Sequence, residues 1–539
     1  MKWRVLIPSL CMLVLVNILA QHWILRWDMT DDHRYSLSAP TKALLGQLDA
    51  PVKVTLLLDG ELNSGFLRLR KATKELIEEM SIYSSASVDL VCDSESIPQG
   101  VLPIVIHERT HKGQTAQTTV YPYAVVQYKD KQTIVELLCN NRGLSGEENL
   151  NLSIENLEYA FVESLRRLMQ TQVEKIAFLE GHGELPEENV YEISQSLAHY
   201  YQIDRGVLGN EDSVLDGYRV VIIADPQRPF SDQDKYILDQ YLMRGGRIFW
   251  LLSGVQFSTE RLSSQGTTPI VPLDLNLTDM LFRYGVRVNP SVVQDLQCLP
   301  VPVDVSADPA QPNWQPMPWT YAPLLLTSQS SSITRGLMQV SVTMPSCIEF
   351  VGGDDGLRKE VLLATSSASK LTPAPAEIDL SLVTDNESEF RYSFIPVAAS
   401  IEGTFSSLFS YRMPPTGMIV HTPLRKSSLL TKQVVVASGS VIRNEWQNGR
   451  PIPLGYDRYT HTQFGNSDFI VNAVLYLADD IGWMSLRQKE VTLRLLNNRR
   501  ACEQRVKAQM ISIAMPLVLL AVMGGIVLWT RKHQYTKRQ

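Results

Sequence analysis

The residues with the clearest chemical potential follow a short apolar run near the middle of the chain. Residues 176–179 are apolar, and Glu180, His182 and Glu184 follow them with glycines between. A buried strand, a Gly-rich turn and a helix over 188–200 are typical of an α/β active-site loop, because open α/β sheets bind ligands at the carboxyl ends of their strands. Two interpretations stay open. In one, the three polar side chains bind a sugar, a peptide or a partner; in the other, the loop is only a solvated turn.

A literal H-E-x-x-H motif spans His107 to His111. In zinc proteases the two histidines lie one helical turn apart, and the glutamate activates the zinc-bound water. Here residues 102–106 predict a strand and residues 112–113 a turn. On a strand the histidines would lie roughly 13 Å apart, because each residue advances about 3.3 Å. We therefore expect no metal there. If the motif did bind zinc, the protein would instead be a membrane-tethered hydrolase or zinc metalloprotease that uses His107, Glu108 and His111.

Two further polar residues are candidates for ligand or partner binding. Ser438 follows the strand predicted over 433–437, but its surroundings are not the G-x-S-x-G turn of a serine hydrolase. Asn466 opens a predicted helix over 468–477, where Asn466 or Ser467 could instead be the N-cap. The sequence has no G-x-x-x-x-G-K-[ST] motif for nucleotide phosphates. We therefore expect no cofactor and no enzymatic activity.

Two charge-free segments predict transmembrane helices near the ends of the chain. Residues 5–25 and 510–529 contain no Asp, Glu, Lys or Arg, and about twenty residues suffice to cross a hydrocarbon core. Lys2 and Arg4 place the start of the chain in the cytoplasm under the positive-inside rule. The sequence thus predicts a membrane protein with two spans, both termini cytoplasmic and the main body on the outer side of the membrane.

The second predicted span carries small residues that would let another helix approach closely. These are Ala521, Gly524 and Gly525, and helix association in lipid depends on such packing. The preceding residues, 486–509, predict a basic juxtamembrane helix that contacts lipid headgroups or a permease, or is simply solvated. The formal charge of −7 gives no basic surface for nucleic acid.

The body divides into two predicted α/β domains. The first, over 28–140, combines strands at 52–58 and 87–92, a helix at 66–80 and a hairpin between 118–126 and 132–138. Cys92 and Cys139 could pair within it in an oxidising compartment, or stay free thiols.

The second domain, over 150–485, is predicted to begin with a helix at 153–169 capped by Ser153. Apolar strands then alternate with helices, which predicts a mostly parallel sheet covered on both faces. One of these helices begins at Ser231 with a sequence resembling a capping box. From about 255 to 425 the pattern is rich in Pro, Ser and Thr, as an insertion would be.

Three stretches of the sequence carry a resemblance to a known family: residues 30–80, 154–187 and 463–496. They resemble the Gld-type gliding-motility-associated ABC-transporter auxiliary (substrate-binding-like) family, component G, of Bacteroidetes. The likeness spans nearly the whole chain and is weakest between about 290 and 420.

The resemblance implies a cytoplasmic-membrane protein with a periplasmic body, and as partners a multi-span permease, an ATP-binding subunit and possibly other motility or secretion proteins. It also implies that the central domain has a glutamine-amidotransferase-like, flavodoxin-like fold. The nucleophilic Cys of the glutaminases, on a tight strand-to-helix turn, has no counterpart here.

Overall fold

The computed structural model describes residues 36–536, apart from gaps at 61, 94–96, 99–100, 110–114, 140, 142–143, 171–172, 305, 307–312, 353–355, 380–386 and 489–504. The chain forms two units, residues 1–490 and 491–539. The predicted first transmembrane helix, 5–25, lies outside the described residues.

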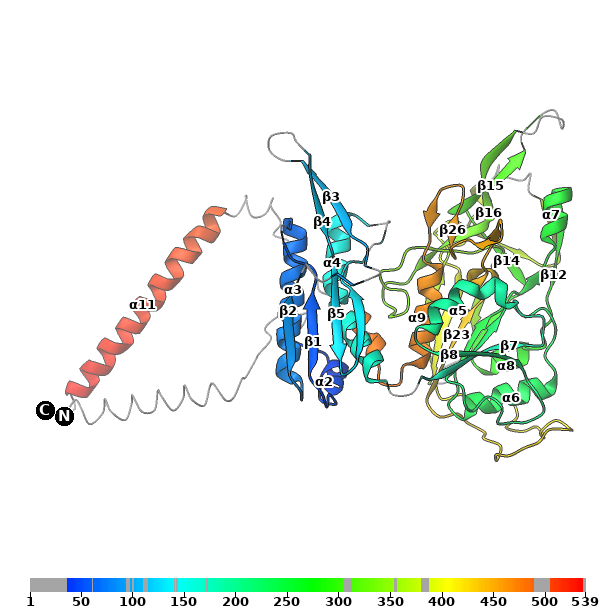
Figure 1. Cartoon of the computed structure of the whole chain (residues 1–539), viewed down its shortest axis with the longest axis horizontal. Helices are drawn as coiled ribbons and strands as arrows, with labels where there is room; N and C mark the ends of the chain where they lie inside the picture. The colour runs from blue at the N-terminus through cyan, green and yellow to red at the C-terminus, as the bar shows by residue number, and fades with distance from the viewer. Residues whose placement is uncertain are drawn as a thin grey trace. The chain divides into compact units, whose positions relative to one another are not determined.

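The N-terminal part of the first unit is built on a four-stranded sheet with the order β2-β1-β5-β6 (Figure 1). Strands β1 and β2 are parallel, and the other neighbours are antiparallel. The predicted hairpin is confirmed as β5–β6, but residues 118–120 belong to β4, which pairs with β3. The elements are α2 (Ala39–Leu45), β1 (Val52–Leu56), α3 (Ser64–Tyr83), β2 (Val88–Cys92), β3 (Ile104–Arg109), β4 (Thr115–Val120), β5 (Tyr123–Tyr128) and β6 (Lys131–Glu136).

Helix α4 (Gly146–Met169) packs its apolar face on this sheet. The predicted cap at Ser153 is wrong, because Ser145 begins the helix two turns earlier in a capping box with Glu148. Ser153 is buried inside the helix, where its Oγ donates to Asn149 O at 2.6 Å and accepts from Cys139 N at 2.8 Å. Cys139 and Cys92 are free thiols in the structure.

The larger part of the first unit is organised around a ten-stranded sheet. Its main path runs β15-β16-β19-β22-β23-β10-β9-β7-β8, and β17 pairs with β16. The strands are β7 (Lys175–Glu180), β8 (Gln202–Val207), β9 (Val220–Ala224), β10 (Ile248–Leu251), β15 (Cys298–Asp304), β16 (Trp314–Thr327), β17 (Val340–Ser341), β19 (Arg358–Ala364), β22 (Pro396–Gly403) and β23 (Thr431–Val436).

The prediction of a mostly parallel sheet holds for only half of these strands. Strands β23, β10, β9, β7 and β8 are parallel to one another, whereas β22, β19, β16 and β15 extend the sheet beyond β23 by antiparallel pairing. Most of the antiparallel strands come from residues 255–425. The Pro-rich sequence there gives little signal for these strands, because pairing partners, rather than local pattern, decide strand formation.

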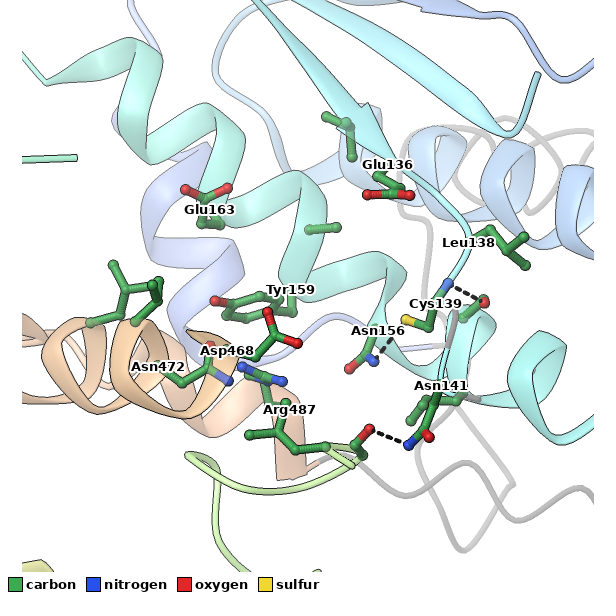
Figure 2. Close-up of a pocket in the computed structure, with 18 of the residues that line it drawn as sticks. Glu136, Leu138, Cys139, Asn141, Asn156, Tyr159, Glu163, Asp468, Asn472 and Arg487 are labelled. Carbon is green, nitrogen blue, oxygen red and sulfur yellow. Dashed lines mark hydrogen bonds between the residues drawn. The ribbon is translucent and has the colours of Figure 1, made fainter. Parts of the chain in front are cut away.

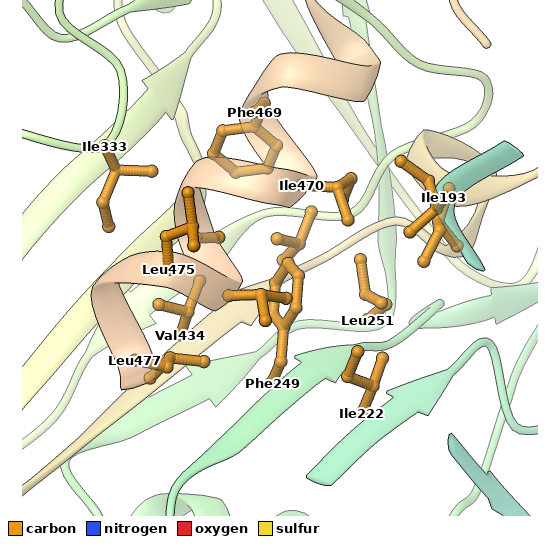
Figure 3. Packing of buried hydrophobic residues seen from close by; sticks show 14 of the residues in the cluster. Ile193, Ile222, Phe249, Leu251, Ile333, Val434, Phe469, Ile470, Leu475 and Leu477 are labelled. Carbon is orange, nitrogen blue, oxygen red and sulfur yellow. The ribbon is translucent and has the colours of Figure 1, made fainter. Parts of the chain in front are cut away.

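Side chains of the central strands alternate between two cores, as the period of two requires. On one face, Ile222, Phe249 and Val434 pack under helix α9 (Asn466–Ala478), whose Phe469, Ile470 and Leu475 cover them (Figure 3). On the other face, the intervening strand residues pack against α6 (Asp232–Met243) and α8 (Thr278–Arg283). Because helices cover both faces of the sheet, side chains on both faces are buried, and the central strands are therefore apolar almost throughout.

The capping box predicted at Ser231 is confirmed. Its Oγ accepts from Asp234 N at 3.2 Å, and its own N donates to Asp234 Oδ2 at 3.1 Å.

The remaining short elements are η1 (Glu187–Val190), α5 (Tyr191–Ala198), β11 (Val255–Gln256), α7 (Thr259–Gln265), β12 (Thr267–Pro272), β13 (Val286–Val288), β14 (Ser291–Asp295), β18 (Ile348–Phe350), β20 (Ser369–Pro373), β21 (Ala376–Asp379), η2 (Glu387–Glu389), η3 (Gly439–Ile442), β24 (Trp446–Gln447), β25 (Arg450–Pro451), β26 (Tyr456–Asp457), β27 (Thr462–Gln463) and η4 (Trp483–Gln488).

The second unit contains one long helix, α11 (Arg505–Thr536). Within the described residues, its segment Gln509–Thr530 is the one helix long and apolar enough to cross a membrane. The small residues Gly524 and Gly525 have open space where a Cβ would lie, so their surface is free for another helix.

Candidate functional site

The loop after β7 lies where the order of the parallel strands reverses. The chain leaves β7, returns as β8 on one side of it, and then forms β9 on the other side. A crevice at the carboxyl ends of strands opens at such a point in open α/β sheets. Residues 181–184 directly follow the carboxyl end of β7, where the loop was expected from the sequence. The loop is tied to the end of β9, because Leu185 N donates to Ala224 O at 2.9 Å and Gln227 N to His182 O at 2.8 Å.

His182 is buried in this loop and bridges two carboxylates. Its Nδ1 lies 3.0 Å from Glu184 Oε1, and its Nε2 lies 3.2 Å from Asp234 Oδ2. The imidazole stacks on the Phe230 ring, with centroids 3.8 Å apart. Burial disfavours the charged imidazole, but the hydrogen bonds to Asp234 and Glu184 outweigh it and raise the pKa of His182 to about 9. At neutral pH the imidazole of His182 therefore carries a positive charge and lies between the two carboxylates.

The predicted ligand-binding side chains of this loop all have partners within the protein. Glu184 also accepts from His182 N at 2.6 Å, and Glu180 Oε1 forms an ion pair with Arg205 Nε at 2.8 Å. The structure contradicts one of the two interpretations, that of a solvated turn. The side chains of His182 and Glu184 are only 10% and 2% exposed.

A second cluster at the same edge was missed by sequence reasoning. Asp225, directly after β9, has the left-handed φ of +53°. Its carboxylate accepts from Ser253 Oγ at 2.6 Å and from Arg443 Nη2 at 2.9 Å. A Cβ on Gly439 would lie 2.0 Å from Asp225 Cγ, so only glycine fits there. The available signal was an acid immediately after a buried strand.

Ser438 and Asn466, the two further candidates for ligand or partner binding, are both buried and contact other residues of the chain. Ser438 is buried, and its Oγ lies 2.8 Å from Ser440 Oγ. Asn466 Oδ1 accepts from Ser341 N at 3.0 Å, and Asn466 Nδ2 donates to Ser341 O at 2.8 Å and Val441 O at 3.2 Å. The possible N-cap role of Asn466 or Ser467 is wrong, because the N-cap of α9 is Gly465. Asn466 instead holds β17 and η3 to the start of α9.

The H-E-x-x-H motif lies partly in strand β3. His107 and Glu108 are strand residues, paired with Gln117 and Ala116 of β4. His111 lies outside the described residues. The strand backbone differs from the helix on which a zinc protease places its ligands.

A large cavity lies between α4 and β6 on one side and α9 and η4 on the other (Figure 2). Its volume is about 850 Å³. Asn141 Nδ2 donates to Gly336 O at 3.0 Å, and Glu155 pairs with Arg335 at 3.4 Å, so polar contacts join the two parts of the unit beside it.

The cavity brings together residues separated by hundreds of positions in the sequence. Burial raises the pKa of Glu136, Glu163 and Asp468, although Glu136 and Asp468 still face water inside the cavity. The lining also includes Tyr159, Asn472, Arg167, Arg335 and Arg487. Groups with shifted pKa values in one cavity are typical of a binding site.

Comparison with known proteins identifies the family. The model of a family described as "ABC-type uncharacterized transport system" matches residues 174–473, more than half of the chain. A model described as "Domain of unknown function (DUF7088)" matches residues 31–127. The chain therefore belongs to this ABC-type transport-system family and is an ABC-transporter auxiliary component.

The chain is also similar to individual proteins. An uncharacterized protein of Borreliella burgdorferi is 20% identical over 530 residues, which cover 95% of this chain and 94% of that protein. Among solved structures, the mmIFT52 N-terminal domain is 15% identical with a TM-score of 0.32, covering 60% of this chain and all of that one. The exo-beta-1,4-mannosidase Op5Man5 from Opitutaceae bacterium strain TAV5 is 12% identical with a TM-score of 0.18, covering 53% and 35%. Both TM-scores are too low to define a shared fold.

Proposed function

We propose that this chain is a non-catalytic, membrane-anchored component of an ABC transporter of the gliding-motility type. Its body would bind a substrate or partner proteins in the periplasm of a bacterium, and its membrane helices would pack with the permease. The observation that carries the proposal is the family match over 174–473 in a chain that also has a helix of membrane-spanning length, Gln509–Thr530.

The proposal assigns binding to this chain and ATP hydrolysis to another subunit, and it rests on which functional motifs the sequence contains and which it lacks. No phosphate-binding loop motif occurs in the sequence, so ATP hydrolysis is assigned to a separate subunit. The polar groups at the carboxyl edge of the sheet are engaged with one another, through His182, Asp225 and their partners. That arrangement supports a binding and scaffolding role in preference to hydrolysis.

The proposed topology predicts that both termini are cytoplasmic. Alkaline phosphatase fused after Gln539 should be inactive, because the enzyme needs the oxidising periplasm. The same reporter inserted at an exposed site of the body, beside Tyr411, which is 93% exposed, should be active. An active fusion at the carboxyl end would contradict two spans.

Assembly provides the direct test of the transporter role. The full chain, solubilised from membranes in a mild detergent, should co-purify a multi-span permease and an ATP-binding subunit, identified by mass spectrometry. Recovery of the chain without either would contradict the proposal.

Within that experiment, Gly524→Leu with Gly525→Leu should reduce permease recovery several-fold, because bulky side chains prevent close helix approach. The matched control is Leu519→Phe with Leu520→Phe, which changes bulk in the same helix without removing small residues. Undiminished recovery of the permease by the glycine variant would leave the periplasmic body as the docking surface.

A further inference from the structure

Residues 404–430, between β22 and β23, form a long loop that hydrogen bonds hold along helix α6 (Figure 1). We call this loop the strap. Its two limbs lie side by side, because Ser407 N donates to Lys426 O at 2.9 Å. The buried Asp239 of α6 accepts from Leu408 N at 2.8 Å and so fixes the first limb to the helix.

The second limb of the strap is fixed in the same way. Arg425 N donates to Gln240 Oε1 of α6 at 2.9 Å, and His421 N donates to the buried Asp212 at 2.8 Å. These bonds use backbone atoms of the strap. Its side chains are therefore left free to serve another purpose.

The charge of the strap is opposite to that of the whole chain. The strap contains Arg412, Arg425 and Lys426 but no Asp or Glu, whereas the chain has a formal charge of −7. Arg412 pairs with Asp279 Oδ2 at 3.2 Å. The side chains of Arg425 and Lys426 are exposed and pair with no residue in the described part of the chain. The strap thus presents positive charge to a partner outside the body.

Large apolar side chains project from the strap beside these cations. Tyr411 is 93% exposed, Met413 89% and Leu430 71%. Ser410 Oγ donates to Lys426 O at 3.1 Å, so the residue before Tyr411 contacts the limb that carries the free cations. A single exposed apolar residue needs no explanation, but several together mark an interaction surface.

The combination of cations and projecting apolar groups fits the surface of a bilayer that contains anionic lipids. Basic side chains are attracted to anionic headgroups, and Tyr is suited to the boundary between headgroups and acyl chains. Tyr411 and Met413 are exposed enough to project from a convex surface. A bilayer interface accepts such projections, whereas a protein partner needs a pocket of matching shape. The helix Gln509–Thr530 would keep the body of the chain beside a membrane.

We propose that the strap docks the body on an anionic membrane surface. Tyr411 and Met413 enter the lipid interface, and Arg425 and Lys426 contact lipid phosphates. Docking would restrict the orientation of the body relative to the bilayer. The inference rests on the membrane anchoring in the proposed function, but not on assembly with a permease.

Photo-crosslinking of the full chain tests the proposal. The purified chain, with a photo-crosslinking amino acid at Met413, is reconstituted into phosphatidylcholine vesicles with or without phosphatidylglycerol and irradiated. Mass spectrometry should find at least about fivefold more lipid adducts at this position when phosphatidylglycerol is present, because each cation near an anionic surface strengthens binding by about that factor. The matched control position is Val207, an exposed apolar residue at the end of β8, which should give few adducts in either vesicle.

Removing the two free cations should abolish this dependence on lipid charge. Arg425→Gln with Lys426→Gln should lower the adducts in anionic vesicles to the level found in phosphatidylcholine alone. The fold should be retained, because the hydrogen bonds at both positions use backbone atoms, and thermal unfolding checks this. The matched control is Lys71→Gln with Arg358→Gln, two exposed cations outside the strap, which should leave the adducts unchanged.

Four results would overturn the proposal. Two are equal adducts at Met413 and Val207, and adducts that do not depend on phosphatidylglycerol. The third is a labelled chain that, irradiated in native membranes, is joined mainly to protein, which would assign the strap to a protein partner. The fourth is a chain that does not float with either vesicle, which would contradict the membrane anchoring as well. A chain that floats but gives either of the first two results contradicts the docking alone.

Discussion

Replacing His182 with Ala should destabilise the protein by about 3 kcal/mol at pH 6 and by much less at pH 9.5. The folded pKa of about 9 lies above the unfolded value of about 6.5. The charge-linked stability is therefore fully present below about pH 6.5 and is lost as the pH rises through about 9. A difference of roughly 2.5 pKa units corresponds to about 3 kcal/mol. Denaturant unfolding of the full chain at both pH values measures it.

The control for this prediction is His421→Ala. The His421 side chain is exposed, and the backbone N of His421 donates to Asp212 at 2.8 Å, a contact that the substitution retains. Its effect should stay within about 0.5 kcal/mol. A loss in His182→Ala that is the same at pH 6 and pH 9.5 would contradict the charged bridge between Glu184 and Asp234.

The second large effect is expected at Asp239, which is fully buried in α6. Its carboxylate accepts from Ser407 Oγ at 2.6 Å, Leu408 N at 2.8 Å, Tyr284 OH at 2.8 Å and Gln240 Nε2 at 3.0 Å. Asp239→Ala removes the acceptor of Ser407 Oγ, Leu408 N and Tyr284 OH, while Gln240 Nε2 still donates to Arg425 O at 3.2 Å. Breaking a buried network of this kind costs about 4 kcal/mol. Denaturant unfolding should show a loss of that size.

The same substitution should release the segment after β22, because Asp239 holds residues 407 and 408 in place. Trypsin should then cleave at Arg412, which is exposed, faster than in the parent chain. Asp232→Ala, an exposed acid in the first turn of the same helix, is the control and should cost no more than about 1 kcal/mol. Unchanged cleavage at Arg412 in Asp239→Ala would mean that other contacts hold the segment.

The sequence by itself determined the elements whose signal is local. Strands β7 and β23 were predicted because uninterrupted apolar runs have few other stable conformations. The start of α6 was readable because a capping box lies within four residues. The membrane-length helix near the carboxyl end follows from composition alone.

Only the tertiary structure decided how the chemical groups are used. His182 and Glu184 occupy the predicted loop, but their burial depends on Phe230 and Asp234, some fifty residues away, so exposure could not be read locally. The antiparallel half of the sheet likewise depends on pairing between distant strands. The cavity is the extreme case, since Glu136 and Asp468 line one space only because β6 and α9 lie on its two sides. Hydrophobic periodicity reports which face of an element is buried, but not which distant element covers it.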